Sequence, residues 1–211
     1  MSDERVEGQL FIFSGPSGSG KDTLLLEFFK VRPDVKLSIS STTRQMRNGE
    51  VQGEKYNFVS REDFENGIKN DEFLEYNEYL WNLYGTPKAP VEECLKNGTD
   101  MILEVDVNGA MKVMKLMPEA VSVFIMPPSF EELRRRLSGR GTETDEVLRG
   151  RLNEAVREIA QAGEYDYIIT TNNVKESVIE LDAIIRSEKL RIKNKKYLID
   201  EVLSDVKSGN W

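Results

Sequence analysis

A glycine-rich segment near the start of the chain constrains its fold more than any other feature. The segment reads Gly15-Pro-Ser-Gly-Ser-Gly-Lys21-Asp-Thr23 and lies between the apolar run 9–14 and a second apolar run that begins at Leu24. Glycines let successive backbone N–H groups converge on one anion because no Cβ atom intervenes, and the N-terminus of a following helix adds its positive pole. The lysine reaches the oxygens of a bound phosphate. The sequence therefore predicts a polyphosphate-binding loop made of Gly15, Pro16, Ser17, Gly18, Ser19, Gly20, Lys21, Asp22 and Thr23.

Short apolar runs alternate with longer amphipathic segments along most of the chain, which is the order of β-α-β units in a parallel sheet. The apolar runs are continuous, as in strands that are buried on both faces. The fold class is therefore α/β. We predict strands at 9–14, 36–39, 100–106, 121–126 and 166–170, and helices at 21–30, 91–96, 108–116, 129–138, 145–162 and 175–206.

Two intervals depart from this pattern. From residue 40 to 98 polar and apolar residues alternate in places, as in 72–80, which is typical of half-buried antiparallel strands and predicts an insert with its own sheet. Residues 139–145 carry glycine beside arginine between two predicted helices, which is the composition of a hinged, charged lid. We therefore divide the chain into core segments 1–36, 99–134 and 165–211, an insert 37–98 and a lid 135–164.

Composition excludes several classes of function. The formal net charge is −8, which argues against sequence-independent binding to nucleic acid, and we interpret the basic run 189–196 as a solvated helix face. The chain has no histidine, so imidazole chemistry is excluded, and its single cysteine, Cys94, makes no internal disulfide. No apolar run approaches the ~20 residues that span a membrane, and no basic-then-apolar leader opens the chain. We expect a cytoplasmic protein with no membrane role.

Further motifs occur in a fixed order between residues 9 and 173. They read Ser38-Ile-Ser-Ser-Thr-Thr-Arg44, Gly49-Glu-Val-Gln-Gly53, Tyr56-Asn-Phe-Val-Ser60, Tyr84-Gly-Thr-Pro87 and Gly139-Arg-Gly-Thr-Glu143. Together with the glycine-rich loop, this set resembles the guanylate kinase family. The resemblance implies a P-loop NTPase core, in which helices flank a parallel sheet, with a small mixed or antiparallel GMP-binding insert and a helical lid. It also implies transfer of the γ-phosphate of ATP to GMP, and to dGMP, in purine nucleotide metabolism.

In that family arginines and tyrosines of the insert hold the monophosphate, and the matching residues here are Arg44, Arg47, Tyr56 and Tyr84. The chemistry agrees, because guanidinium groups make paired contacts with phosphate and phenol hydroxyls donate without adding charge. Without the neighbouring motifs, the two arginines would be interpreted as part of a solvated turn.

Guanine presents its N1–H and 2-amino groups as donors, so a pocket that prefers it to adenine needs a carboxylate acceptor. By the resemblance, Glu75 is that acceptor. Ser40 and Thr86 match the family's hydroxyl positions around the base, and each also has a simpler interpretation as a turn or cap residue.

Two carboxylates, Glu104 and Asp106, lie on the same side at the end of the predicted strand 100–106. In a P-loop protein such residues hold Mg²⁺ directly or through its waters, and Asp106 has a second candidate role on the guanine amino group. Asp22 stands where the loop usually has a Mg²⁺-binding Ser or Thr, with Thr23 beside it. Its carboxylate either coordinates the ion or repels the triphosphate, so we expect a sharp dependence on Mg²⁺.

The resemblance assigns three arginines to closure over the nucleotides, namely Arg136, Arg140 and Arg151. Arginines that arrive with a lid stabilise the charge that shifts during phosphoryl transfer, and lid closure excludes water. With Lys21 and Arg44 they form the predicted catalytic set. On the adenine side, Thr171 stands where the family commonly has asparagine.

The nucleophile implied by this interpretation is an oxygen of the GMP phosphate, which is largely dianionic near neutral pH and needs no general base. One alternative is a non-catalytic binding module, although modules of this family lack working P-loops. Another is a kinase of a different phosphorylated small molecule, such as a sugar phosphate, against which Glu75 argues. A homo-oligomer is also compatible with the sequence. The last helix is expected to pack on the core or on a second subunit through Leu181, Ile184, Ile185, Leu190 and Ile192.

Overall fold

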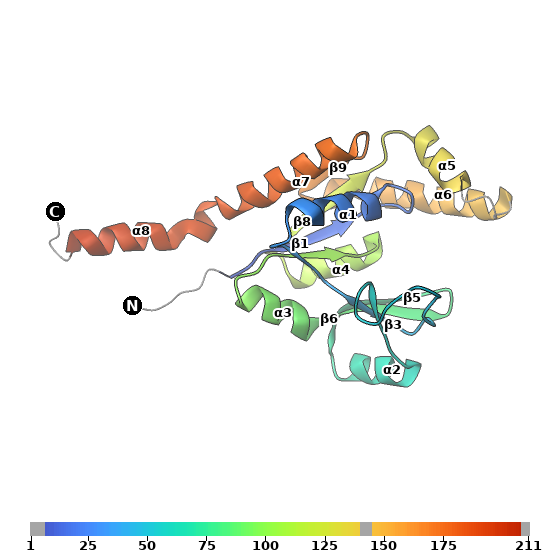
Figure 1. The fold of residues 1–211 in the computed structure, drawn as a ribbon, viewed down its shortest axis with the longest axis horizontal. Helices are drawn as coiled ribbons and strands as arrows, with labels where there is room; N and C mark the ends of the chain where they lie inside the picture. The colour runs from blue at the N-terminus through green and yellow to red at the C-terminus, as the bar shows by residue number, and fades with distance from the viewer. Residues whose placement is uncertain (1–6, 140–144, 208–211) are drawn as a thin grey trace.

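A parallel sheet lies at the centre of the molecule, with helices on both of its faces (Figure 1). The computed structural model describes residues 7–139 and 145–207 of the chain. Neighbouring strands of this sheet pair in parallel, so the predicted α/β class is confirmed. The strand order is β2-β7-β1-β8-β9, with β1 (Leu10–Ser14), β2 (Lys36–Leu37), β7 (Met101–Glu104), β8 (Val121–Met126) and β9 (Tyr167–Thr170).

The central strand β1 builds both halves of the core because its side chains alternate between the two faces of the sheet. The covering helices are α1 (Lys21–Val31), α7 (Val174–Lys189), α3 (Lys88–Lys96) and α4 (Val107–Leu116). Phe11 belongs to a buried cluster with Phe28 of α1 and Leu181 of α7. Leu10 belongs to a second cluster with Val113 of α4. The sheet is therefore buried on both faces, as its continuous apolar strands predict.

A second sheet of four strands carries the alternating residues of the predicted insert. Its order is β4-β3-β6-β5, with β3 (Ser40–Thr42), β4 (Tyr56–Phe58), β5 (Phe73–Tyr79) and β6 (Asn82–Pro87), and α2 (Arg61–Lys69) follows β4. β5 pairs antiparallel with β6, as the alternation predicts, and β6 pairs antiparallel with β3. β3 and β4 are parallel, so the sheet is mixed.

Two helices between β8 and β9 lie together at one end of the molecule (Figure 1). They are α5 (Phe130–Ser138) and α6 (Asp145–Ala160), and a 3₁₀ turn, Ala162–Glu164, leads from α6 to β9. Ser129 caps α5, because its Oγ accepts a hydrogen bond from the Glu132 backbone N–H at 3.1 Å. The Glu132 carboxylate binds Arg135 and Arg136. The Glu132 side chain therefore orients two arginines of its own helix.

The C-terminal region departs from the single helix predicted over 175–206. The chain forms α7 and then α8 (Ile192–Lys207), with Leu190 at the break. Leu181 is fully buried, but Leu190 and Ile192 are 71% and 76% exposed and do not pack on the core. The reason is that α8 projects away from the body of the molecule (Figure 1). None of the described helices is long and apolar enough to cross a membrane.

Leu181 offers a test of the packing between α7 and the sheet. Replacing this fully buried residue in Leu181→Ala leaves a cavity, and we expect the free energy of unfolding to fall by about 2–5 kcal/mol. Ile179 lies on the same helix but is 68% exposed, so Ile179→Ala is the matched control and should change stability by under ~0.5 kcal/mol. Urea unfolding measures both. Equal losses in the two variants would contradict this packing.

Candidate nucleotide-binding site

The glycine-rich loop forms between β1 and α1, and its first residue is held against the next strand. Gly15 has a φ of 148°, and a Cβ atom there would stand 2.4 Å from the carbonyl oxygen of Ile125 on β8. The loop thus needs glycine at this place both for its backbone conformation and for the close approach. Gly20, with a φ of 100°, ends the loop and begins α1 at Lys21. The predicted strand, loop and helix are confirmed.

Lys21 lies across the mouth of the loop. Its Nζ donates hydrogen bonds to the carbonyl oxygens of Gly15 at 2.6 Å and Pro16 at 3.2 Å. Burial lowers the pKa of Lys21, and the carboxylates of Glu104 and Glu158 oppose that shift. The Lys21 ammonium group is therefore already in place for a phosphate. Its present partners are neutral carbonyls, which bind a cation more weakly than phosphate oxygens do.

Two carboxylates meet beside Lys21. Glu104 ends β7, opposite Phe13 of β1, and Asp22 is the second residue of α1. Burial, and next the neighbouring charge of Asp22, raises the pKa of Glu104 to about 7. Two hard oxygen donors that destabilise each other's charge fit a divalent cation such as Mg²⁺, which takes its other ligands from phosphate and water. No cluster of three or more acidic or cysteine side chains that could hold a metal by itself occurs among the described residues.

Asp106 has structural partners on both of its oxygens. Oδ1 accepts from the backbone N–H of Gly109 at 2.6 Å and caps α4, and Oδ2 accepts from Asn77 Nδ2 on β5 at 2.7 Å. It therefore joins the core to the second sheet. Lys55 makes a second, looser connection, with its Nζ 3.9 Å from Asp22 Oδ1. Thr23, the other predicted metal-binding residue of the loop, is exposed on α1.

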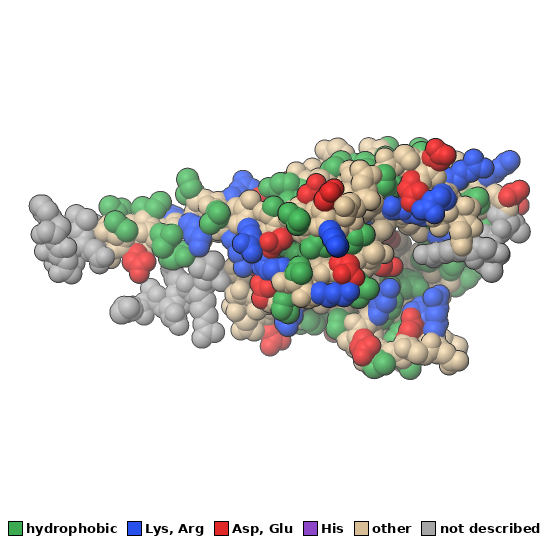
Figure 2. All heavy atoms as spheres, turned by 45° about the horizontal axis from the view of Figure 1, so that its top comes forward, with side chains coloured by type: hydrophobic (Ala, Val, Ile, Leu, Met, Phe, Trp, Pro, Cys, Tyr) green, Lys and Arg blue, Asp and Glu red, His purple; other side chains and the backbone are tan. Residues whose placement is uncertain are grey.

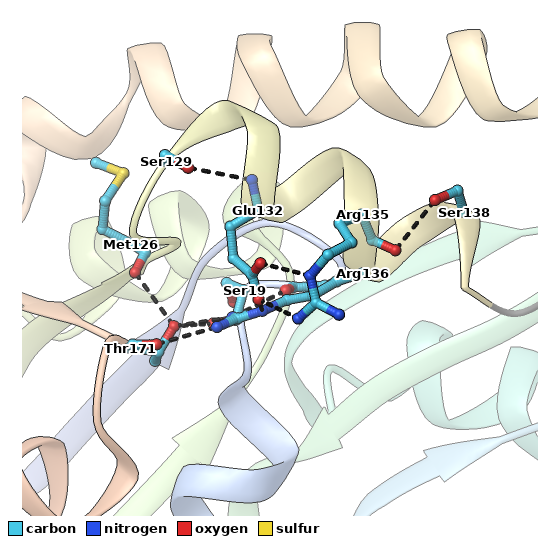
Figure 3. Close-up of polar contacts among 9 residues, drawn as sticks. Ser19, Met126, Ser129, Glu132, Arg135, Arg136, Ser138 and Thr171 are labelled. Carbon is cyan, nitrogen blue, oxygen red and sulfur yellow. Dashed lines mark hydrogen bonds and ion pairs between the residues drawn. The ribbon is translucent and has the colours of Figure 1, made fainter.

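Arg136 of α5 binds the phosphate loop itself (Figure 3). Its Nη1 donates to the carbonyl oxygen of Ser19 at 2.9 Å and to Thr171 Oγ1 at 3.0 Å, and its Nη2 donates to the Thr171 carbonyl at 3.0 Å. Its Nε donates to Glu132 at 2.8 Å. The guanidinium thus ties α5 to the loop and to the turn after β9.

Thr171 completes this network from the buried side. Its hydroxyl donates to the same Ser19 carbonyl that Arg136 binds, so one loop carbonyl accepts from two elements far apart in sequence. The sequence marked Thr171 only as a departure from the family pattern. Its role becomes visible only in the fold, because the residues around Thr171 do not indicate its distant partners Ser19 and Arg136.

Of the other two arginines that the sequence assigns to closure, Arg151 lies in the part of the chain that the structure describes. Arg151 of α6 donates from Nη2 to Ser17 Oγ in the phosphate loop at 2.9 Å. Arg140 lies outside the described residues. Glu158, on α6 with Arg151, is half-buried. Burial raises the pKa of Glu158 to about 7, and the charge of Lys21 opposes this shift. Sequence patterns do not single out Glu158, since a glutamate on an amphipathic helix usually faces solvent.

The second sheet gathers the predicted monophosphate residues. Arg44 makes a paired contact with Glu50, with Nη1 and Nη2 at 2.9 and 2.8 Å from its two oxygens. The hydrogen bonds from Arg44, followed by that from the Arg47 backbone N–H, lower the pKa of Glu50 to about 2. The Arg44 guanidinium also lies 5.5 Å from the centre of the Tyr56 ring. Tyr56 in turn packs edge-on against Tyr84, at 5.9 Å between ring centres.

Glu50 is the partner that the sequence did not single out, although it lies inside one of the motifs. It holds Arg44 in one orientation and takes the backbone N–H of Arg47 at 2.8 Å, so both arginines stand on the same turn. Ser40 lies on β3 directly beside Tyr56 in the parallel pair β3–β4. The four predicted phosphate residues are therefore brought to one part of the second sheet.

The second sheet also holds a buried carboxylate. Glu75 on β5 is 7% exposed and accepts a hydrogen bond from Thr86 Oγ1 on β6 at 2.8 Å. Burial raises the pKa of Glu75 to about 7, while the Thr86 hydrogen bond opposes the shift. A Cβ atom on Gly109 would stand 2.9 Å from Glu75 Oε2, so the missing side chain on α4 makes room for the carboxylate. The first turn of α4 thus packs directly against this carboxylate.

These features are those of a P-loop nucleotide kinase: a glycine-rich loop at the end of a strand in a parallel sheet, and a second sheet with an arginine and tyrosine cluster and a buried carboxylate. The guanylate kinase family model matches residues 7–188. The chain is 46% identical over 195 residues to the guanylate kinase of Clostridioides difficile, covering 92% of this chain and 95% of that one. It is 42% identical over 203 residues to that of Escherichia coli K12, covering 95% and 98%. The crystal structure of guanylate kinase from Anaplasma phagocytophilum superimposes with a TM-score of 0.72 at 34% identity, covering 88% of each chain. The chain belongs to the guanylate kinase family.

Thr171 offers a test of the network around the phosphate loop. Thr171→Val removes the hydroxyl that bridges Ser19 and Arg136 while keeping the side-chain shape, and we expect a loss of about 1–3 kcal/mol in the free energy of unfolding. Thr171→Ser retains the hydroxyl and is the matched control, with a smaller loss. Urea unfolding of the pair measures the hydrogen bonds separately from the methyl group. If the valine variant is as stable as the serine variant, the hydroxyl does not support the loop.

Proposed function

We propose that this protein is an ATP:GMP phosphotransferase, which moves the γ-phosphate of ATP to GMP, or to dGMP, and releases ADP and GDP. The observation that carries the proposal is the buried Glu75 of β5, which accepts a hydrogen bond from Thr86 on the neighbouring strand and lies against Gly109 of α4. A carboxylate in this place matches the N1–H and 2-amino donors of guanine, whereas adenine offers no such pair. Family membership supports the same conclusion.

We assign the ATP phosphates to the loop 15–23. Lys21 exchanges its two carbonyl contacts for phosphate oxygens, and the backbone N–H groups and the N-terminus of α1 supply the rest of the positive field. Arg151 already contacts the loop serine, Ser17, and so lies within reach of the same phosphates. Arg136 supports the loop through Ser19 and Thr171, and in this arrangement it positions the loop as well as contributing its charge.

We assign the GMP phosphate to Arg44, Arg47, Tyr56 and Tyr84, and the base to Ser40, Glu75, Thr86 and Asp106. Glu50 orients the Arg44 guanidinium before the substrate binds, so less rotational freedom is lost on binding. Because its pKa is raised to about 7, the Glu75 carboxyl is divided about equally between its protonated and ionised forms near neutral pH. Two guanine N–H donors stabilise the ionised form, which couples recognition of the base to the charge of the pocket.

The chemistry needs no side-chain base. The attacking oxygen belongs to the GMP phosphate, whose second pKa is about 6, so it is largely ionised near neutral pH. The protein aligns this oxygen with the γ-phosphate, and the arginines stabilise charge that spreads during transfer. Mg²⁺, held near Asp22, Glu104, Thr23 and Asp106, supplies neutralisation of the phosphate charge when bound. α5 and α6, with the segment between them, serve as the lid that excludes water.

The division into core, insert and lid belongs to this proposal. The insert 37–98 carries the GMP residues, the lid 135–164 carries Arg136, Arg140 and Arg151, and the three remaining segments form the core. We place the reaction in the cytoplasm. Thiols stay reduced there, and the single cysteine, Cys94, is free.

The test is ADP production by the pure protein with ATP and Mg²⁺, using GMP, dGMP, AMP, CMP and UMP as separate acceptors. We expect turnover with GMP and dGMP only, and the Glu75→Gln variant should lose most of that turnover because an amide presents a donor where the base needs an acceptor. A folded protein without turnover on any nucleotide would favour the binding module. Turnover with a sugar phosphate alone would favour the altered-substrate kinase.

Gly109 offers a finer test of the base pocket. Gly109→Ala adds a methyl group 2.9 Å from the Glu75 carboxylate, and we expect a roughly tenfold rise in the KM for GMP with a smaller change in kcat. Gly163 has open space around its Cα, so Gly163→Ala is the matched control and should leave KM unchanged. Steady-state kinetics at saturating ATP measures both. Equal KM values for the two variants would contradict a pocket wall at α4.

A further inference from the structure

Lys55 extends from the insert to the phosphate loop. It is the last residue before β4, and its Nζ lies 3.9 Å from Oδ1 of Asp22, the second residue of α1. Its charge also acts on Glu104, the carboxylate beside Asp22. Burial raises the pKa of Glu104, and the charges of Lys21 and then Lys55 oppose the shift. One ammonium group of the insert therefore lies close to the charged groups around the loop lysine.

A hydrogen-bonded turn fixes the backbone of Lys55 at the start of β4. The backbone N–H of Gly53 donates to the Tyr56 carbonyl at 3.0 Å, and the side-chain oxygen of Gln52 accepts from the Phe58 backbone N–H at 2.8 Å. The side chain of Lys55 is 60% exposed, and a lysine ammonium group sits on a flexible four-carbon stem. The turn therefore holds the residue in place, while its charge can move from one partner to another.

The ion pair between Lys55 and Asp22 is easily exchanged. The two side chains are 60% and 71% exposed, and an ion pair this open to water contributes little to stability. Under the proposed function, Asp22 and Glu104 are also the carboxylates that take a divalent cation with ATP. When their oxygens are taken in this way, Lys55 loses its carboxylate partner but stays beside the loop.

A phosphate at this loop depends on local cations. The net charge of the chain is −8, and Figure 2 shows acidic and basic side chains interspersed over one face of its described residues. That face presents no broad basic surface among those residues to attract a triphosphate. The loop lysine, Lys21, is influenced by the charges of Glu104 and Asp22, which offset its own. A further cation beside Asp22 therefore favours an anion at the loop.

We propose that Lys55 is a further phosphate-binding residue, which leaves Asp22 when nucleotide binds and donates hydrogen bonds to the γ-phosphate of ATP. The inference rests on the proposed function, because it takes the loop 15–23 as the site of the ATP phosphates. Lys55 directly precedes Tyr56, which packs against Tyr84 in the cluster assigned to the GMP phosphate. The γ-phosphate is the ATP phosphate that must approach GMP, so it is the one that a residue of the insert can reach. An ammonium group there stabilises the charge of the group in transfer.

Isothermal titration calorimetry of the full-length protein tests this contact without turnover. The probes are ADP and the β,γ-imido analogue of ATP, each with Mg²⁺, because they differ by the γ-phosphate. Lys55→Met should weaken binding of the analogue about tenfold and binding of ADP less than about twofold, since only the analogue has the group that Lys55 binds. Lys55→Arg keeps the charge and should recover most of the loss. Equal affinity of Lys55→Met and wild type for the analogue, or an equal loss for ADP, overturns the proposal.

Lys69→Met is the matched control for the loss of a positive charge. Lys69 is an exposed lysine of the same insert, on α2, which lies on the side of the insert away from α1 (Figure 1). This variant changes the net charge by the same amount as Lys55→Met and should bind both probes as the wild type does. Far-ultraviolet circular dichroism and urea unfolding establish that the variants are folded. An equal loss in the control would show a general effect of charge and would overturn the assignment to Lys55.

Asp22→Ser separates a contact with phosphate from simple neutralisation of Asp22. In this variant Lys55 has no carboxylate at position 22 to neutralise, but it can still bind the γ-phosphate. Adding Lys55→Met to Asp22→Ser should therefore weaken binding of the ATP analogue again, by roughly fivefold or more. If Lys55→Met has no effect in the Asp22→Ser protein, Lys55 serves only as the counter-charge of Asp22, and the proposal is overturned.

Steady-state kinetics with ATP and GMP gives the role of Lys55 in the reaction. Lys55→Met should lower kcat about tenfold or more and change the KM for GMP less than about threefold, because the contact acts on the group in transfer. A change in the KM for GMP alone would place Lys55 on the acceptor phosphate and overturn the assignment to the γ-phosphate. A wild-type protein that binds the analogue but does not turn over GMP overturns the proposed function, whereas the calorimetry still decides whether Lys55 binds the γ-phosphate.

Discussion

The carbonyl oxygen of Ser19 is the point on which the arrangement of the site depends. It accepts hydrogen bonds from Arg136 of the helix α5 and from the hydroxyl of Thr171 after β9 (Figure 3). Three parts of the chain that are far apart in sequence therefore meet at one atom of the phosphate loop. Because the loop owes its anion-binding shape to its backbone, holding one carbonyl in place helps to aim its N–H groups at a phosphate.

A second constraint is electrostatic. Glu75, Glu104 and Glu158 are the carboxyls near the site whose pKa burial raises to about 7. Each is poorly solvated and has few compensating contacts, so each gains from a ligand that brings donors or positive charge. Guanine N–H groups suit Glu75, and a metal ion suits Glu104 beside Asp22. Under the proposed function, ligands that bring donors or positive charge relieve the unfavourable burial of these carboxylates.

Local sequence patterns predicted much of the fold. The five strands of the parallel sheet and the helices that cover it follow from continuous apolar runs and amphipathic periodicity, which are properties of neighbouring residues. The α3 helix begins three residues earlier than predicted, at Lys88, because Pro90 is tolerated in a first turn whose N–H groups have no helical partner. The region 175–206 was predicted as one helix and is two, since periodicity alone did not register the break at Leu190. The periodicity of α8 also did not predict that its apolar residues are exposed, because periodicity identifies an apolar face but not what packs against it.

The sequence by itself determined the fold class, the phosphate loop and the candidate residues of the two nucleotide sites, because these are written in contiguous motifs whose backbone chemistry acts locally. Tertiary structure decided which partners those residues have. Arg136 binds the loop, Glu50 orients Arg44, and Gly109 makes room for Glu75. Of Arg136, Glu50 and Gly109, only Arg136 had been singled out from the sequence. Such pairings depend on how separate helices and strands pack against one another. No stretch of neighbouring residues specifies the distance between two side chains on different elements.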